Sequence, residues 1–214
     1  MPRITRLAAS RRTGRVVLEL DGETWGSLPD SVVLSNSLHE GQDLDEADLE
    51  ALGTEVALAE TLNAALSCLA YRPRSRTELL RHLRRKGHAE EPTCTAISRC
   101  EELGYIDDRA FALSFVRDRI RFRPSGRRRL RSELGARGVG AEDAESALEE
   151  AFREFGVSER DLLRQSATRR ARALQSAERS AARRRLSGYL LRRGFAGGDV
   201  RSIVDELLPE SERP

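Results

Sequence analysis

The sequence is poor in aromatic side chains and in lysine. Only six Phe, three Tyr and one Trp occur among 214 residues, and Lys86 is the only lysine. Apolar residues make up 39% of the chain and charged residues 34%. This composition can build several modest hydrophobic cores but not one large core. We therefore expect one or two ordinary domains, or an array of smaller units.

Long apolar runs are also missing from the sequence. None approaches the ~20 residues that a helix needs to cross a bilayer, so we expect no membrane span. The first residues, MPRITRLAASRRTGR, carry charge but no apolar segment, unlike a secretory signal. The three cysteines, Cys68, Cys94 and Cys100, show no C-x-x-C spacing. Reduced thiols in the cytoplasm are the simplest interpretation.

Residue sets typical of enzymes are absent. There is no G-x-x-x-x-G-K-[ST] loop and no G-x-S-x-G elbow. His39, His82 and His88 have no metal-ligand spacing with one another. His88 could approach Cys94 across a turn, but a surface histidine and a packed cysteine are the favoured interpretation. We expect no enzyme, no catalytic residue, no cofactor and no bound metal.

The charge is distributed unevenly along the chain. Residues 1–65 contain five Arg against twelve Asp and Glu, so the remaining residues hold 32 basic and 23 acidic side chains. An acidic head therefore precedes a basic body. This asymmetry favours a polyanion or an acidic protein surface as the partner of the body, although solvated helix faces would give a similar composition.

The acidic head, residues 1–54, has the pattern of a β-hairpin. Asp21-Gly22 is a dipeptide suited to a tight turn, and it separates probable strands at 16–20 and 24–28. Residues 31–35 are compatible with a third strand or with the start of a helix. Helical sequence begins shortly afterwards, with Asp43 or Asp45 as the cap.

Three glycines mark a repeat in the rest of the chain: Gly87, Gly138 and Gly194, which lie 51 and 56 residues apart. A basic residue precedes each glycine, and leucines occur eight and four residues before it. These leucines are Leu79 and Leu83, Leu130 and Leu134, and Leu186 and Leu190. Leucines four apart share one helix face, and a glycine just after the last turn can adopt the left-handed conformation that ends a helix.

A second helical pattern follows each glycine, so that two helices flank it. A further helix precedes each of these pairs, at about 55–71, 107–121 and 158–178. The sequence therefore predicts three tandem three-helix units, at 55–106, 107–156 and 157–214, which share contacts with their neighbours. The predicted fold is mainly all-α, with three three-helix-bundle repeats behind a small N-terminal extension that contains a β-hairpin.

Several motifs resemble those of the RecX family of regulators of the RecA recombinase. They are SRTELLRHLRRKGH, ELGYIDDRAFALSFVRDRI and SGRRRLRSELGARGV, and the resemblance covers about residues 60–208. The third unit departs most from the family pattern. The resemblance implies an elongated, curved helical array that binds RecA and the RecA–single-stranded DNA filament and restrains ATP hydrolysis and strand exchange in DNA repair and recombination.

The three helices before the glycines carry most of the candidate contact residues. We expect a monomer whose basic face binds the filament, with phosphate contact to DNA as a further expectation. The stretch 117–131 is the strongest basic cluster because it has few acids near it in the sequence. Phe122 within it could stack on a base, but packing against its own bundle is the preferred interpretation. The candidate residues are Arg76, Arg81, Arg84, Arg85, Lys86, Arg117, Arg119, Arg121, Arg123, Arg127, Arg128, Arg129, Arg131, Arg183, Arg184 and Arg185.

A second class of function is an autonomous, sequence-nonspecific DNA-binding helical-repeat protein. Two short helices joined at a glycine resemble a helix-turn-helix, whose second helix enters the major groove. Here the helix after the glycine is acidic, as in AEEPTCTAISRCEEL and GAEDAESALEEAF. Base reading by these helices is therefore not expected, whereas backbone binding by the basic helices stays open.

Overall fold

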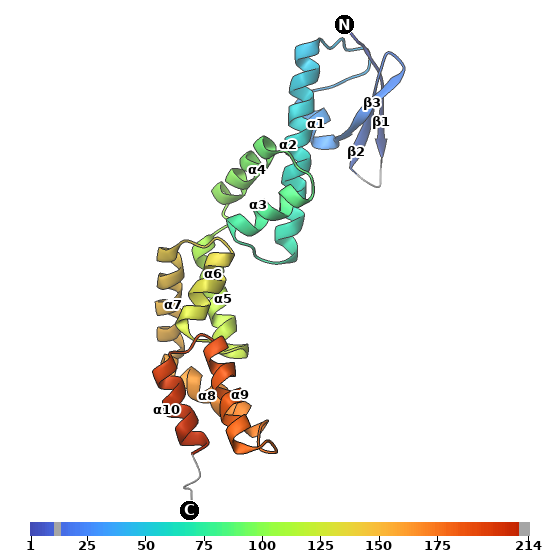
Figure 1. Ribbon diagram of the computed structural model, residues 1–214. Helices are drawn as coiled ribbons and strands as arrows, with labels where there is room; N and C mark the ends of the chain where they lie inside the picture. Colours follow the sequence, from blue (N-terminus) through green and yellow to red (C-terminus); the bar gives the residue numbers. More distant parts are fainter. Residues whose placement is uncertain (11–13, 210–214) are drawn as a thin grey trace, which may run out of the picture. The chain divides into compact units, whose positions relative to one another are not determined.

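The computed structural model describes residues 1–10 and 14–209, and the chain forms two compact units (Figure 1). The first unit comprises Met1–Arg74 and Glu78–Ile106, and the second comprises Ser75–Thr77 and Asp107–Pro214. The described chain is mainly helical with one small sheet, as the sequence predicts. Residues 11–13 of the predicted extension and 210–214 of the predicted third repeat lie outside the described residues.

An antiparallel sheet in the order β1-β2-β3 forms the head of the first unit. Its strands are β1 (Ile4–Ser10), β2 (Arg15–Leu20) and β3 (Glu23–Pro29). Asp21 and Gly22 join β2 to β3 with φ values of 49° and 87°, the backbone that a two-residue hairpin turn requires. This confirms the predicted hairpin. Strand β1 was not predicted from the sequence, because a register shift between Ile4 and Arg6 breaks its apolar alternation.

Residues 31–35, which the pattern left open, belong to a helix, α1 (Asp30–Ser35). The next helix, α2 (Glu46–Tyr71), is capped by Asp45, whose side chain accepts from the N–H of Asp48 at 2.8 Å. This is one of the two predicted caps. The N-terminal part of α2 contributes Leu52 to the core of the head, whose other members include Leu18, Leu28 and Val32.

The rest of the first unit packs around α3 (Arg76–Arg85) and α4 (Glu90–Glu102). Leu79 and Leu83 are fully buried and contact Cys68 from α2 and Cys100 from α4. Cys68 and Cys100 are therefore core residues. Cys94 is exposed, so the expectation of a packed cysteine at this position is wrong.

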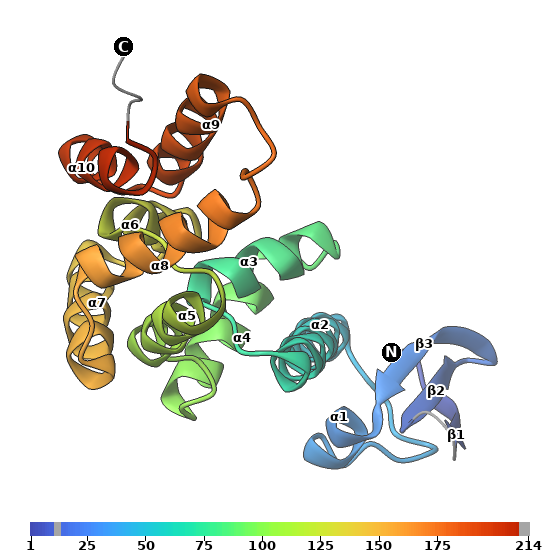
Figure 2. The same ribbon diagram turned by 90° about the horizontal axis from the view of Figure 1, so that it is seen from below.

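Six further helices make up the second unit, and α9 and α10 lie together as a pair in both Figure 1 and Figure 2. They are α5 (Asp108–Phe122), α6 (Arg127–Ala136), α7 (Ala141–Phe155), α8 (Glu159–Arg172), α9 (Arg179–Arg192) and α10 (Gly197–Leu207). The side chain of Ser158 caps α8, at the residue where the sequence predicts that this helix begins. The predicted end of this helix at 178 is wrong, because Leu174 is buried in a turn and Glu178 caps α9.

A single hydrophobic core runs through the six helices of the second unit. It includes Leu130 and Leu134 of α6 together with Leu186 and Leu190 of α9, and all four are fully buried. The prediction that neighbouring repeats share contacts is therefore confirmed for these helices. Leu162 of α8 joins the same core.

The close approach of Gly126 and Gly194 joins the two halves of the second unit. The N–H of Gly126 donates to the carbonyl oxygen of Arg193 at 2.9 Å. A Cβ on Gly126 would lie 2.3 Å from the carbonyl oxygen of Gly194, and one on Gly194 would lie 2.5 Å from the Cβ of Arg129. Only glycine fits at this contact. Gly194 also has φ +81°, the left-handed conformation expected after a helix.

We predict that Gly126→Ala lowers the free energy of unfolding by about 1–3 kcal/mol, because the methyl group overpacks a backbone contact. Gly198→Ala is the matched control: it lies in α10, has no atom within 4 Å of its added Cβ, and should be neutral or slightly stabilising. Chemical denaturation of both variants measures the difference. Equal stability of the two variants would contradict the proposed steric role of Gly126.

Candidate functional site

The basic side chains project from helices whose opposite faces are buried. In α3, α6 and α9 the paired leucines point into a core, and most of the arginines occupy exposed positions. The described part of the chain thus has the amphipathic pattern that the sequence predicts for each basic helix. Their positions alone do not show which cations are available to a partner, because many of them contact acidic side chains.

In α3, Arg84 forms an ion pair with Glu90, and its Nε lies 2.9 Å from Glu90 Oε2. Arg85 Nη2 lies 3.2 Å from His82 Nδ1. Burial lowers the pKa of His82, and nearby cationic side chains, including Arg85 and Lys86, lower it further. His82 is therefore neutral near pH 7, and its Nδ1 can accept this hydrogen bond. Arg76, Arg81 and Lys86 are exposed.

The stretch 117–131 is more neutralised than its sequence suggests. Arg119 and Arg129 both contact Glu133, at 2.9 and 2.7 Å. The carboxyl of Glu133 is partly buried, which opposes ionisation, but hydrogen bonds from Arg129 and Arg119 outweigh burial and lower its pKa. Few acids lie near this stretch in the sequence, but the fold brings Glu133 into contact with two of its arginines. The expectation that the cluster has few acids nearby is therefore wrong.

Helix α7 supplies the remaining acids of this cluster. Glu145 accepts from Arg131 Nε at 2.5 Å and from Arg127 Nη1 at 3.3 Å. The hydrogen bond from Arg131 is the main reason why the pKa of Glu145 lies below its ordinary value. Glu154, also in α7, forms an ion pair with Arg117 of α5 at 2.6 Å.

Aromatic rings hold several of these guanidinium groups. Arg119 and Arg137 both lie 4.5 Å from the ring centroid of Phe115, and Arg127 lies 4.6 Å from that of Phe152. Such cation–π contacts, together with the ion pairs, restrict the side chains of Arg119 and Arg127. These arginines therefore stabilise the second unit.

Phe122 does not pack against its own bundle. It lies at the end of α5 with 69% of its surface exposed, so the preferred interpretation of this residue is wrong. Its neighbours Arg121 and Arg123 are also exposed. Arg121 lies 5.1 Å from the ring centroid of Phe155. The other interpretation, stacking on a base, stays a prediction.

Helix α9 shows the same division between paired and available arginines. Arg183 forms an ion pair with Asp205 and donates to the carbonyl oxygen of Leu208. Arg184 and Arg185 are exposed, and Arg184 Nη1 lies 3.4 Å from Ser180 Oγ. Among the described residues, the predicted basic residues that have no ion pair with a carboxylate are Arg85, Lys86, Arg121, Arg123, Arg128, Arg184 and Arg185.

A groove of about 680 Å³ lies between α6 and the end of α9. Arg128 and Ser132 line it from α6, and Leu191 and Arg192 line it from α9. Arg192 was missed by the sequence analysis. The repeat could have revealed it, because Arg192 lies two residues before Gly194, just as Arg85 lies two residues before Gly87. Arg129 and Glu133, which pair with each other, also line the groove. The groove thus combines two exposed cations without a carboxylate partner among the described residues, Arg128 and Arg192, with the half-exposed Leu191.

The described residues contain no candidate metal site. No group of three or more His, Cys, Asp or Glu side chains could hold a metal ion there. His88 Nδ1 lies 2.9 Å from Thr61 Oγ1. Thr61 donates its hydroxyl hydrogen to the carbonyl oxygen of Ala57 at 2.7 Å, so His88 is the donor to Thr61. Across residues 1–10 and 14–209, no helix is both long enough and apolar enough to cross a membrane.

Two family models match the chain. The model for the first three-helix domain of RecX matches residues 62–100, and the model for the second three-helix domain matches residues 107–148.

Curated proteins named "Regulatory protein RecX" are similar over longer spans. The protein of Prosthecochloris aestuarii is 34% identical over 149 residues, which cover 70% of this chain and 94% of that protein. The protein of Lactobacillus johnsonii is 32% identical over 150 residues, which cover 70% of this chain and 55% of that protein. The chain thus spans about half the length of the latter.

Two solved structures have a similar fold. The crystal structure of a regulatory protein RecX matches with a TM-score of 0.73 and 25% identity, over 96% of this chain and all of that one. RecX from Lactobacillus salivarius matches with a TM-score of 0.57 and 24% identity, over 71% of this chain and 96% of that one. The second match supports the fold alone.

The ion pairs of Glu145 lead to a prediction about acid stability. Because its pKa is below the ordinary 4.5, its contribution to stability is present above about pH 4.5 and is lost as the pH falls through the lowered value. We predict that Glu145→Gln is less stable than the wild type at pH 7 and that the difference narrows on acidification. Thermal unfolding followed by circular dichroism over this range measures it.

Glu149→Gln is the matched control, since Glu149 is an exposed residue of the same helix without an ion pair to any described residue. If the stability of Glu145→Gln depends on pH in the same way as that of the wild type, the proposed contribution of the Glu145 ion pairs to stability is refuted.

Proposed function

The chain belongs to the RecX family of regulatory proteins, and we propose that it binds RecA and the RecA–single-stranded DNA filament and inhibits ATP hydrolysis and strand exchange. In this proposal the protein is a non-enzymatic, monomeric, cytoplasmic modulator of recombination and DNA repair in the SOS response. Its repeats correspond to residues 55–106, 107–156 and 157–214, behind an extension at 1–54.

The observation that carries the proposal is the set of exposed cations without a carboxylate partner on equivalent helices. Arg128 on α6 has its counterpart in Arg184 on α9, ten residues before the aligned glycine in both cases. Arg185 lies beside Arg184 and is likewise exposed. The matching position in α3 is Thr77, so two of the three basic helices carry this cation. Cations at matching positions of neighbouring repeats suit a target that itself repeats, such as a protein–DNA filament.

The candidate residues therefore divide into two groups within the proposal. Arg117, Arg119, Arg127, Arg129, Arg131 and Arg183 are ion-paired and support the fold. If such an intramolecular ion pair had to break before the arginine could contact a partner, part of the free energy of binding would be lost. Arg128, Arg184 and Arg185 need no such exchange, so we assign them the larger share of partner binding.

Direct DNA binding is a second candidate function, and the exposed ring of Phe122 favours it. The ring is flanked by the cations Arg121 and Arg123, an arrangement suited to stacking on a base beside two phosphate contacts. In this case the basic helices would bind nucleic acid without RecA.

The decisive measurement is ATP hydrolysis by the cognate RecA on single-stranded DNA while this protein is titrated onto preformed filaments. A parallel series contains excess free DNA. We expect inhibition well below one molecule per RecA that persists in excess DNA. Inhibition that disappears as free DNA is added would favour competition for DNA, and the second candidate would replace the first.

Charge reversal locates the contact face. We predict that Arg128→Glu/Arg185→Glu weakens inhibition on the order of tenfold, because two unpaired cations are replaced by carboxylates facing a polyanionic filament. Arg117→Gln is the control: its ion pair with Glu154 is a surface pair worth about 0.2–1 kcal/mol of stability, and its inhibitory potency should be unchanged. Equal potency of the two variants would show that the unpaired cations do not form the contact face.

A further inference from the structure

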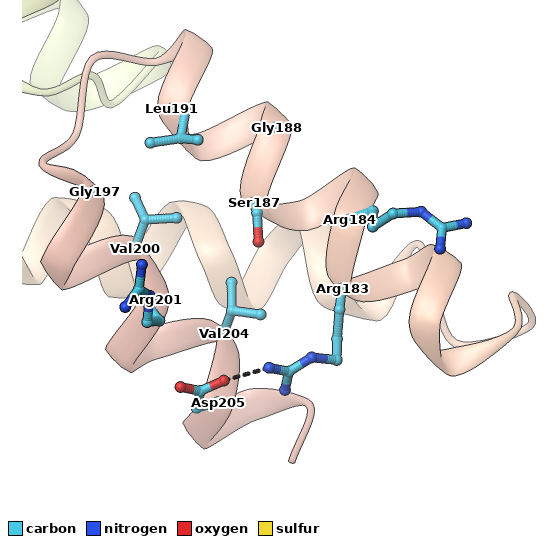
Figure 3. A pocket seen from close by; sticks show the side chains of 10 residues that line it. All are labelled: Arg183, Arg184, Ser187, Gly188, Leu191, Gly197, Val200, Arg201, Val204 and Asp205. Atoms are coloured by element: carbon cyan, nitrogen blue, oxygen red, sulfur yellow. Dashed lines mark hydrogen bonds and ion pairs between the residues drawn. The ribbon is translucent and has the colours of Figure 1, made fainter. Parts of the chain in front are cut away.

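A second groove, of about 590 Å³, lies between α9 and α10 (Figure 3). Leu191 and Gly188 line it from α9, and Val200 and Val204 line it from α10. Leu191 also borders the groove beside α6, but the other residues belong to this groove alone. The volume falls within the range of ordinary ligand-binding clefts.

The floor of this groove is apolar and is accessible because its neighbours are small. Val200 and Val204 are each 2% exposed, whereas Leu191 is 45% exposed. Gly188 and Gly197 place no side chain over the floor. An apolar side chain of a ligand can therefore contact Leu191 and remove it from water, which is favourable.

The rim of the groove is cationic. Among the residues that the structure describes, Asp205 is the only acidic one that lines it, and it forms an ion pair with Arg183. Arg184 on α9 and Arg201 on α10 have no ion pair with a carboxylate of the described residues. Two uncompensated guanidinium groups thus stand on the two helices that enclose an apolar floor.

We propose that this groove is a docking site for an acidic peptide segment of a partner protein, anchored by one apolar side chain. The guanidinium groups of Arg184 and Arg201 would bind carboxylates flanking the anchor, since the planar fork of arginine matches a carboxylate with two hydrogen bonds. The anchor would lie on Leu191 between the two helices.

A nucleic acid fits this groove less well than a peptide. None of the lining residues is aromatic, so bases have no ring on which to stack. The apolar floor offers nothing to sugar or phosphate. The charge and the apolar floor together match an acidic segment with a hydrophobic residue.

The experiment measures peptide binding to the full chain without RecA, so its outcome is independent of the proposed regulatory function. The probe is a fluorescein-labelled octapeptide, Glu-Asp-Glu-Leu-Leu-Asp-Glu-Asp, followed by fluorescence anisotropy at low ionic strength. A second probe has serine in place of both leucines and the same charge. We expect saturable binding of the leucine probe and at least fivefold weaker binding of the serine probe.

Two variants test the two halves of the groove. Arg184→Gln/Arg201→Gln removes the unpaired cations and should weaken binding about fivefold to tenfold. Gly188→Leu keeps the charge, suits the helix better than glycine, fills the floor and should abolish the preference for leucine. Arg169→Gln/Arg179→Gln is the control, since both arginines are exposed in the second unit and neither lines the groove.

Three outcomes would overturn the proposal. The leucine probe does not bind saturably; both probes bind equally well and Gly188→Leu changes neither; or the control variant loses as much affinity as Arg184→Gln/Arg201→Gln. Oligo(dT) is titrated in parallel. Displacement of the peptide by oligo(dT), with the same dependence on Arg184 and Arg201, would assign the groove to nucleic acid and also reject the peptide.

Discussion

The second unit depends on a backbone contact that tolerates no side chain. Gly126 donates its N–H to the carbonyl oxygen of Arg193, and its missing Cβ leaves room for the carbonyl of Gly194. One residue further along, the N–H of Arg127 donates to Glu159 Oε1 at 3.0 Å, which satisfies a backbone donor at the start of α6. The start of the basic helix α6 is thereby held between α8 and the end of α9. The groove between α6 and the end of α9, which Gly194 lines, lies at this contact.

A corresponding pair of hydrogen bonds forms at the start of α3. The hydroxyl of Ser75 donates to the carbonyl oxygen of Arg137 at 2.5 Å, and the N–H of Arg76 donates to Asp108 Oδ1 at 2.8 Å. Arg76 precedes Arg127 by 51 residues, and Asp108 precedes Glu159 by the same interval. The repeat therefore encodes the contacts made at the starts of α3 and α6 as well as the helices themselves.

The arginines of this protein fall into two groups: those that form ion pairs with acidic side chains of the fold, and those that have no carboxylate partner among the residues that the structure describes. Glu133 and Glu145 each bind two arginines, so much of the apparent cationic surface of α6 is neutralised internally. Such pairs between exposed groups contribute little stability individually, but a network that shares carboxylates orders the long side chains. The cations that remain, such as Arg128 and Arg184, are spaced by the repeat.

The sequence by itself determined the helices, their buried leucines and the glycines that end them, because these features depend on residues within one or two turns of each other. Gly87, Gly138 and Gly194 all have positive φ, as the pattern requires. Only the tertiary structure decided which arginines are available, since most of the acids that bind them come from other helices. Arg117 and Glu154, for example, lie 37 residues apart in the sequence. It also decided that Phe122 is exposed and that grooves form on both sides of Leu191, because a groove depends on how two helices pack and not on either helix alone.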